Sequence, residues 1–229
     1  MSGTAPVRTC AVLLAGTVLC FVAPPLAVGV LAPAPPPPPA LVALALVELA
    51  LAALVVSWWL RRRGLGADSV GLTSRSWGRD TLLGAATVPP RLLLEFGVLV
   101  PAAGGALNPG VQEVLSTAAA GASALTATLL LGIVGGGLAE ELYFRGFLLG
   151  AVPRLFARRR AALYGAAAVS VVLFAVLHLP ASPPDAAAIL LAGLVYTGLF
   201  LATGRLTATV VAHALWNTAA VVAVLALYA

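Results

Sequence analysis

Long runs of apolar residues, separated by short polar connections, make up most of this chain. A transmembrane helix needs about 20 consecutive, mostly apolar residues. Runs of about this length lie at residues 9–31, 40–60, 81–102, 115–137, 161–179, 186–203 and 206–228, and the fourth can continue to residue 152. The pattern predicts an all-α, polytopic transmembrane helical bundle with about seven spans.

A proline tract divides the first apolar run from the rest. Residues 35–39 are five consecutive prolines, which form a stiff polyproline II linker. We therefore predict an N-terminal transmembrane segment and linker at 1–39, accessory transmembrane helices at 40–114, and a catalytic helical core at 115–229. A cleaved signal peptide is the alternative for the first run, because Arg8 precedes its apolar core. We favour a retained helix, since the run lacks a convincing small-residue cleavage site.

Charged residues are scarce and unevenly placed. Hydrophobic residues make up 61% of the chain and charged residues 9%, which is typical of an integral membrane protein. Arginines cluster at 61–63, 75–79, 154–160 and 205, in alternate connections between the predicted spans. Seven spans with a cytoplasmic N-terminus place every cluster inside, as the positive-inside rule requires. This topology explains the net charge of +5, so the charge does not indicate nucleic-acid binding.

A few ionisable residues lie inside the apolar runs. Both histidines of the chain, His178 and His213, are among them, as are the adjacent Glu140 and Glu141. An ionisable side chain at bilayer depth costs roughly 2.5–3.5 kcal/mol on insertion scales, so such residues are rare and usually functional. These residues predict a reactive or conducting site inside the membrane.

The carboxylates belong to the pattern Glu-Glu-x-x-x-Arg. On an α-helix, Glu141 and Arg145 are four residues apart in the orientation that favours an ion pair. Glu140 then points about 100° away from Glu141. One carboxylate is thus neutralised while the other stays free to act as a general base. Upstream, Gly135–Gly137 lack side chains and allow close approach of another helix or of a substrate backbone.

The histidines belong to two further five-residue patterns. Phe174 and His178 share one helix face, and His213 and Asn217 lie side by side on another. An imidazole and a carboxamide at this spacing can hydrogen-bond the same oxygen atom. The sequence lacks the His-Glu-x-x-His zinc-peptidase motif and its inverted form, and no nucleophile-elbow serine is present.

These three motifs, each in its own apolar run, resemble those of the CPBP intramembrane proteases. That family includes the CAAX prenyl endopeptidases and the bacteriocin-processing or immunity proteins of the abortive-infection type. The resemblance covers roughly residues 115–220, and all three motifs are present without substitution. Residues 1–114 contribute only apolar character to it. The resemblance implies a hydrolase site buried between the fourth, fifth and seventh helices.

The resemblance also implies roles for individual residues. Glu140 would activate a water molecule, assisted by His178. His213 and Asn217 would polarise the scissile carbonyl and stabilise its oxyanion, for which paired donors are suited. These four residues are the expected catalytic set, and the activity is that of an intramembrane CAAX-type endopeptidase.

Supporting roles and cofactors follow from the same resemblance. Glu141 and Arg145 would fix the helix and tune Glu140. Glu140, His178 and His213 could alternatively supply three zinc ligands, with water as the fourth, which is the composition of an open catalytic site. We favour glutamate chemistry without a metal, because only Glu141 is available to orient the two imidazoles. A bound Zn²⁺ cofactor is the alternative.

The expected partners are a hydrophobic or lipidated peptide substrate and the membrane lipid, with no nucleic acid. The expected location is a bacterial cytoplasmic membrane. Two other functions fit the same polar residues. One is a non-catalytic peptide-binding or bacteriocin-immunity protein, and the other is a proton-coupled transporter. Metal dependence, substrate identity and oligomeric state are not determined by the sequence.

Overall fold

The computed structural model describes residues 4–229, with the side chains of residue 9 and of residues 11–229. This part of the chain is 85% helical and contains no strand. Seven of its helical segments are long and apolar enough to cross a membrane. The prediction of an all-α polytopic bundle is therefore confirmed.

The N-terminal half contributes three spans. The first consists of α1 (Thr4–Phe21) and α2 (Ala23–Leu31), and the second is α3 (Pro38–Arg63). The third combines α4 (Trp77–Ala86), α5 (Val88–Leu94), the π-helical η2 (Glu95–Leu99) and α6 (Val100–Ala102). Short helices connect the spans, namely η1 (Ala67–Val70), η3 (Gly105–Leu107) and α7 (Pro109–Ala119).

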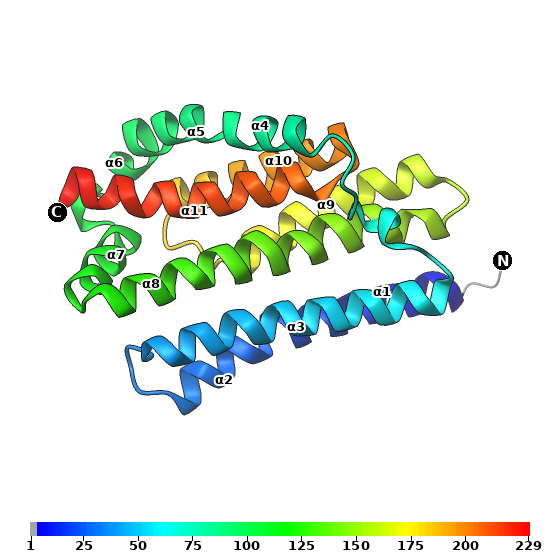
Figure 1. Ribbon diagram of the computed structural model, residues 1–229, viewed down its shortest axis with the longest axis horizontal. Coiled ribbons are helices and arrows are strands. Elements are labelled where there is room, and N and C mark those ends of the chain that lie inside the picture. The colour runs from blue at the N-terminus through cyan, green and yellow to red at the C-terminus, as the bar shows by residue number, and fades with distance from the viewer. Residues whose placement is uncertain (1–3) are drawn as a thin grey trace.

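The C-terminal half contributes four spans. The fourth is formed by α8 (Ala122–Leu130), the π-helical η4 (Leu131–Ala151) and η5 (Val152–Leu155). The last three are α9 (Arg159–Leu177), α10 (Pro183–Thr203) and α11 (Leu206–Tyr228). In Figure 1, α8 and the helix that continues it run between α3 and α11, and η4 packs against both of these helices and against α9.

The fourth span begins later than the prediction of residue 115. Gly121 adopts a φ of +110°, a conformation that favours glycine, and it separates α7 from α8. The span therefore starts at Ala122 and continues to Leu155, so that Glu140, Glu141 and Arg145 all lie within it. Of the two predicted ends of the fourth span, residue 137 and residue 152, the structure therefore supports the later one.

The helix type in η4 also differs from the prediction. Each N–H of a π-helix bonds to the carbonyl five residues back, so the α-helical angle of about 100° between Glu140 and Glu141 does not apply. Asn217 of α11 donates from Nδ2 to the carbonyl of Gly132 at 2.7 Å. A side chain that inserts into the backbone ladder in this way favours a departure from α-helical bonding.

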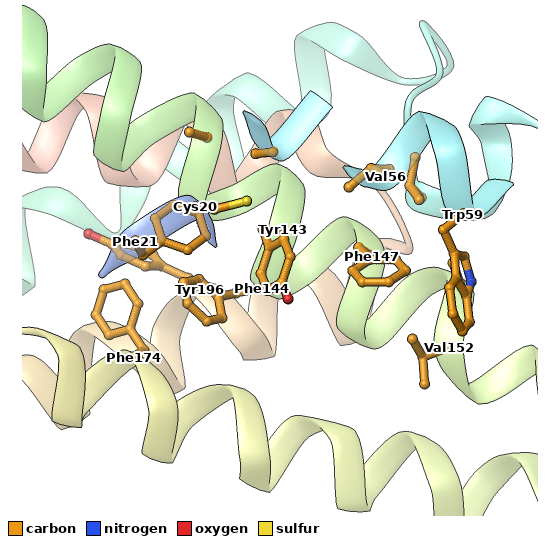
Figure 2. Packing of buried hydrophobic residues seen from close by; sticks show 14 of the residues in the cluster. Cys20, Phe21, Val56, Trp59, Tyr143, Phe144, Phe147, Val152, Phe174 and Tyr196 are labelled. Atoms are coloured by element: carbon orange, nitrogen blue, oxygen red, sulfur yellow. The ribbon is translucent and has the colours of Figure 1, made fainter. Parts of the chain in front are cut away.

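Aromatic side chains fill the space between the first span, α3, η4 and α9. Figure 2 shows Phe21, Tyr143, Phe144 and Phe147 in this cluster, together with Trp59. The Tyr143 hydroxyl donates to the backbone carbonyl of residue 13 at 2.7 Å. The N-terminal span is thus packed directly onto the helix that carries the paired carboxylates.

The connections that carry arginine clusters lie at one end of the bundle. In Figure 1, the end of α3, the turn after η5 and the turn between α10 and α11 lie at the right, where α1 starts. At this end, Arg205 forms a two-pronged ion pair with buried Asp80, and its Nη2–Oδ1 distance is 2.7 Å. The arrangement agrees with the predicted alternation, while a cytoplasmic N-terminus stays a prediction.

Candidate active site

Arg145 and Glu141 form a fully buried ion pair inside η4. The distance from Nη1 of Arg145 to Oε1 of Glu141 is 2.8 Å, and neither side chain is accessible to solvent. The guanidinium also lies 4.6 Å from the ring centroid of Phe174 and 5.3 Å from that of Tyr196. Contacts with aromatic faces stabilise a cation that has lost its water. The predicted pairing of these two residues is thus present.

Glu141 also holds His213. Nδ1 of His213 lies 2.9 Å from Oε1 of Glu141, and a carboxylate oxygen accepts, so Nδ1 carries a hydrogen. The His213 ring stacks on Tyr196, with centroids 4.6 Å apart and planes 20° from parallel. One carboxylate therefore fixes both the cation of its own helix and the imidazole of α11.

Asn217 and His213 converge on the same glycine of η4. A Cβ atom on Gly136 would lie 3.0 Å from Nδ2 of Asn217 and 3.1 Å from Nε2 of His213. The absence of a side chain at Gly136 therefore lets both nitrogens approach the helix that carries Glu140. A Cβ on Gly137 would lie 3.0 Å from the Cβ of Ala214, so this glycine allows the backbones themselves to come close.

The neighbouring Glu140 faces a cavity. The cavity has a volume of about 230 Å³ and is bordered by Glu140, His178 and Glu48 together with apolar residues, which are Phe21, Pro25, Phe144, Phe174 and Leu177. Oε2 of Glu140 is buried and has no hydrogen-bond partner. Glu140 therefore has no protein partner, while Glu141 is held through its Oε1 by Arg145 and His213, although its buried Oε2 has none.

His178 closes α9 at the rim of this cavity and is the most exposed of the six predicted site residues. Its Nδ1 lies 2.8 Å from the carbonyl oxygen of Phe174, so Nδ1 donates the hydrogen. In the neutral ring, Nε2 is then an acceptor. The ring centroids of Phe174 and His178 are 4.3 Å apart, and this contact fixes the orientation of the imidazole.

The predicted zinc ligands do not form a metal site. Within residues 4–229, no three side chains of His, Cys, Asp or Glu are placed so that they could hold a metal ion. Glu140 and His178 share a cavity, whereas His213 is bound to Glu141 and points with Nε2 toward Gly136. In this structure the three residues are not gathered as a ligand set, and no step below depends on a metal.

One feature of the site was missed by sequence reasoning. Glu48 of α3 borders the cavity, although residues 1–114 were expected to contribute only apolar character. The rule that selected Glu140 also selects Glu48, because it is the one ionisable residue within the run 40–60. Arg91, which pairs with Glu95 one turn along its own span, donates from Nη1 to the hydroxyl of Tyr196 at 2.6 Å, and the Tyr196 ring stacks on His213.

Comparison with protein families identifies the segment that carries these residues. Residues 122–219 match the family described as type II CAAX prenyl endopeptidase Rce1-like. This segment is Rce1-like. The match spans all six predicted site residues and confirms the resemblance to CPBP intramembrane proteases. It indicates a CAAX-type intramembrane endopeptidase in general terms.

The family match covers less than half of the chain. The Rce1-like match leaves residues 1–121 uncovered, so Glu48 and Arg91 lie outside the family segment. No curated protein and no solved structure matches the chain. The predicted division at 1–39, 40–114 and 115–229 stays a prediction, and so do the roles of the individual site residues.

Proposed function

We propose that this protein hydrolyses peptide bonds within the membrane and that Glu140 is the general base. The observation that carries the proposal is the contrast between adjacent carboxylates. Oε1 of Glu141 is bound by both Arg145 and His213, whereas Glu140 borders the cavity and neither of its carboxylate oxygens has a hydrogen-bond or ion-pair partner among the described residues. A free carboxylate within reach of a polar cavity is suited to take a proton from water.

The proposed reaction uses residues of η4, α9 and α11. Glu140 accepts a proton from water as the water oxygen attacks the scissile carbonyl carbon. His178 borders the same cavity, where its Nε2 is free to accept a hydrogen bond. The carbonyl electrons move to oxygen, which hydrogen bonds from His213 and Asn217 stabilise. The proton on Glu140 then passes to the leaving amine as the carbon–nitrogen bond breaks.

The hydrogen bond from His213 to Glu141 limits how His213 can stabilise the oxyanion. Because Nδ1 already donates to Glu141, Nε2 can donate to an oxyanion only when the ring carries both hydrogens. Asn217 needs no such change, since its amide has a second N–H beyond the one given to the Gly132 carbonyl.

The substrate class follows from the surroundings of the site. The aromatic and aliphatic residues around the Glu140 cavity suit an apolar peptide that enters from the membrane. A second cavity, of about 450 Å³, is lined mainly by apolar residues of α1, η4, α9 and the turn before α9, including Leu13, Leu148 and Phe156. It is suited to an acyl or prenyl chain. We therefore propose a hydrophobic or lipidated peptide as substrate, which supports peptidase activity over proton transport.

The test compares peptide termini in membranes that express the native protein, Glu140→Gln or the control Glu113→Gln. Glu113 is an exposed carboxylate on α7, remote in sequence from the motifs. New termini should appear with the native protein and the control and be absent with Glu140→Gln. Identical termini in all three membranes, at equal protein levels, would refute peptidase activity and favour the peptide-binding alternative.

A further inference from the structure

A third carboxylate, that of Glu48, borders the catalytic cavity from outside the Rce1-like segment. Glu48 lies in the middle of α3, and only 9% of its surface is exposed. Its carboxylate has no hydrogen-bond or ion-pair partner among the residues that the structure describes. A buried carboxylate without a partner is expensive, so its position calls for a polar ligand in the cavity.

The η4 helix makes room for this carboxylate at one position. A Cβ atom on Gly135 would lie only 2.6 Å from Oε2 of Glu48. Gly135 is five residues before Glu140, which is one turn of the π-helical hydrogen-bond pattern. Glu48 therefore meets η4 one turn from Glu140, and both carboxylates border the same cavity.

The cavity is suited to water. A volume of about 230 Å³ exceeds the roughly 30 Å³ that a water molecule occupies in the liquid. Buried water needs two to four polar partners, and Glu48, Glu140 and His178 supply them. Two carboxylates on different helices can each accept one hydrogen of the same water molecule, and they cannot hydrogen-bond one another when both are ionised.

We propose that Glu48 is a positioning residue that orients the water attacking the peptide bond, an inference that rests on the proposed peptidase function. One hydrogen of the water is transferred to Glu140 as the carbon–oxygen bond forms. The other stays on the water oxygen and donates to Glu48, which takes no proton. With both hydrogens held, a lone pair of the water faces the scissile carbonyl carbon.

Steady-state hydrolysis by the reconstituted protein tests this role through three substitutions. Glu48→Leu removes the acceptor within an apolar helix and should lower kcat about 10- to 100-fold with KM unchanged, the scale of a misplaced reactant. Glu48→Gln keeps an acceptor oxygen and should stay within about 5-fold of native kcat. Glu48→Ala should show a similar loss of kcat alone and regain activity with added formate, which replaces the missing carboxylate.

Formate rescue separates positioning from a structural role, because a helix that has lost its packing is not restored by a small anion. Glu113→Leu is the matched control and should retain native kcat, with or without formate. Native kcat in Glu48→Leu would overturn the proposal. So would a folded Glu48→Ala protein, with native elution behaviour in detergent, that formate does not activate.

An experimental structure of the native protein provides a test that does not depend on turnover. A water molecule should lie within about 3 Å of both the Glu48 and Glu140 carboxylates and be absent in Glu48→Leu. If the water is present but native protein and Glu140→Gln hydrolyse nothing, the proposed peptidase function fails and the water site stands. If no water bridges the two carboxylates, the proposal for Glu48 fails even when peptidase activity is found.

Discussion

Substitution of Arg145 should lower the free energy of unfolding more than substitution of any exposed arginine. Arg145→Met removes the cation that neutralises Glu141, and both side chains are fully buried. Breaking a buried ion pair by removing one partner costs about 3–5 kcal/mol. We expect the lower value, about 3 kcal/mol, because Glu141 keeps its hydrogen bond from His213.

A double-mutant cycle sharpens this prediction. Glu141→Gln leaves Arg145 as an unpaired buried cation and should also cost about 3 kcal/mol, so additive effects would total about 6 kcal/mol. The double variant buries no unpaired charge, and we expect a loss of only about 3 kcal/mol. Arg75, an exposed arginine before α4, is the control, and Arg75→Met should stay within about 0.5 kcal/mol of native.

The assay is reversible unfolding of the purified protein in mixed micelles with increasing dodecyl sulfate, followed by circular dichroism. The free energy of unfolding is compared for native protein, both single variants, the double variant and the control. Additivity within about 0.5 kcal/mol would refute the account of Glu141 and Arg145 as a coupled buried pair. An Arg145→Met loss no larger than that of Arg75→Met would refute it as well.

Three further substitutions test neighbouring parts of the structure. Gly136→Ala places a Cβ about 3 Å from the Asn217 amide and should lower kcat about 10- to 100-fold. The control Gly198→Ala adds a Cβ in open space and should leave kcat unchanged. Initial rates of hydrolysis measure both effects. Asn217→Ala removes one oxyanion donor and should lower kcat by about 10²–10³-fold with little change in KM. Arg205→Gln removes the ion-pair partner of Asp80 and should lower the free energy of unfolding more than Arg75→Met does, measured in the same unfolding titration.

Much of the architecture follows from local sequence properties. Seven apolar runs of sufficient length predict seven spans, because the bilayer demands internally hydrogen-bonded helices. The pairing of Glu141 with Arg145 follows from their spacing of four residues, which brings the side chains together even within the π-helical segment. His213 and Asn217 likewise reach the same glycine because they share one stripe of α11.

Other features depend on how distant segments pack and were not predictable from local patterns. The late start of the fourth span depends on the conformation of Gly121, and the π-helical bonding of η4 accompanies contact with Asn217. The approach of Glu48 to Gly135 joins two helices far apart in sequence. Periodicity within one segment cannot indicate which face of another segment will lie beside it.

The choice between Glu140 and Glu141 as the reactive carboxylate illustrates the same limit. Spacing pairs Glu141 with Arg145, but the hydrogen bond to His213 arises only when α11 packs beside η4. That contact adds a second partner to Oε1 of Glu141, while Glu140 borders the cavity without a protein partner. The distinct roles of two adjacent glutamates are therefore a property of the folded bundle.

The central claim is that Glu140 activates water for peptide hydrolysis, and one measurement addresses it most directly. A peptide identified from the membrane comparison is incubated in ¹⁸O-labelled water with purified, liposome-reconstituted native protein, Glu140→Gln or Glu113→Gln. The account predicts ¹⁸O in the newly formed carboxylate for the native protein and the Glu113→Gln control, and none for Glu140→Gln. Labelled product at the native rate from folded Glu140→Gln would contradict the account.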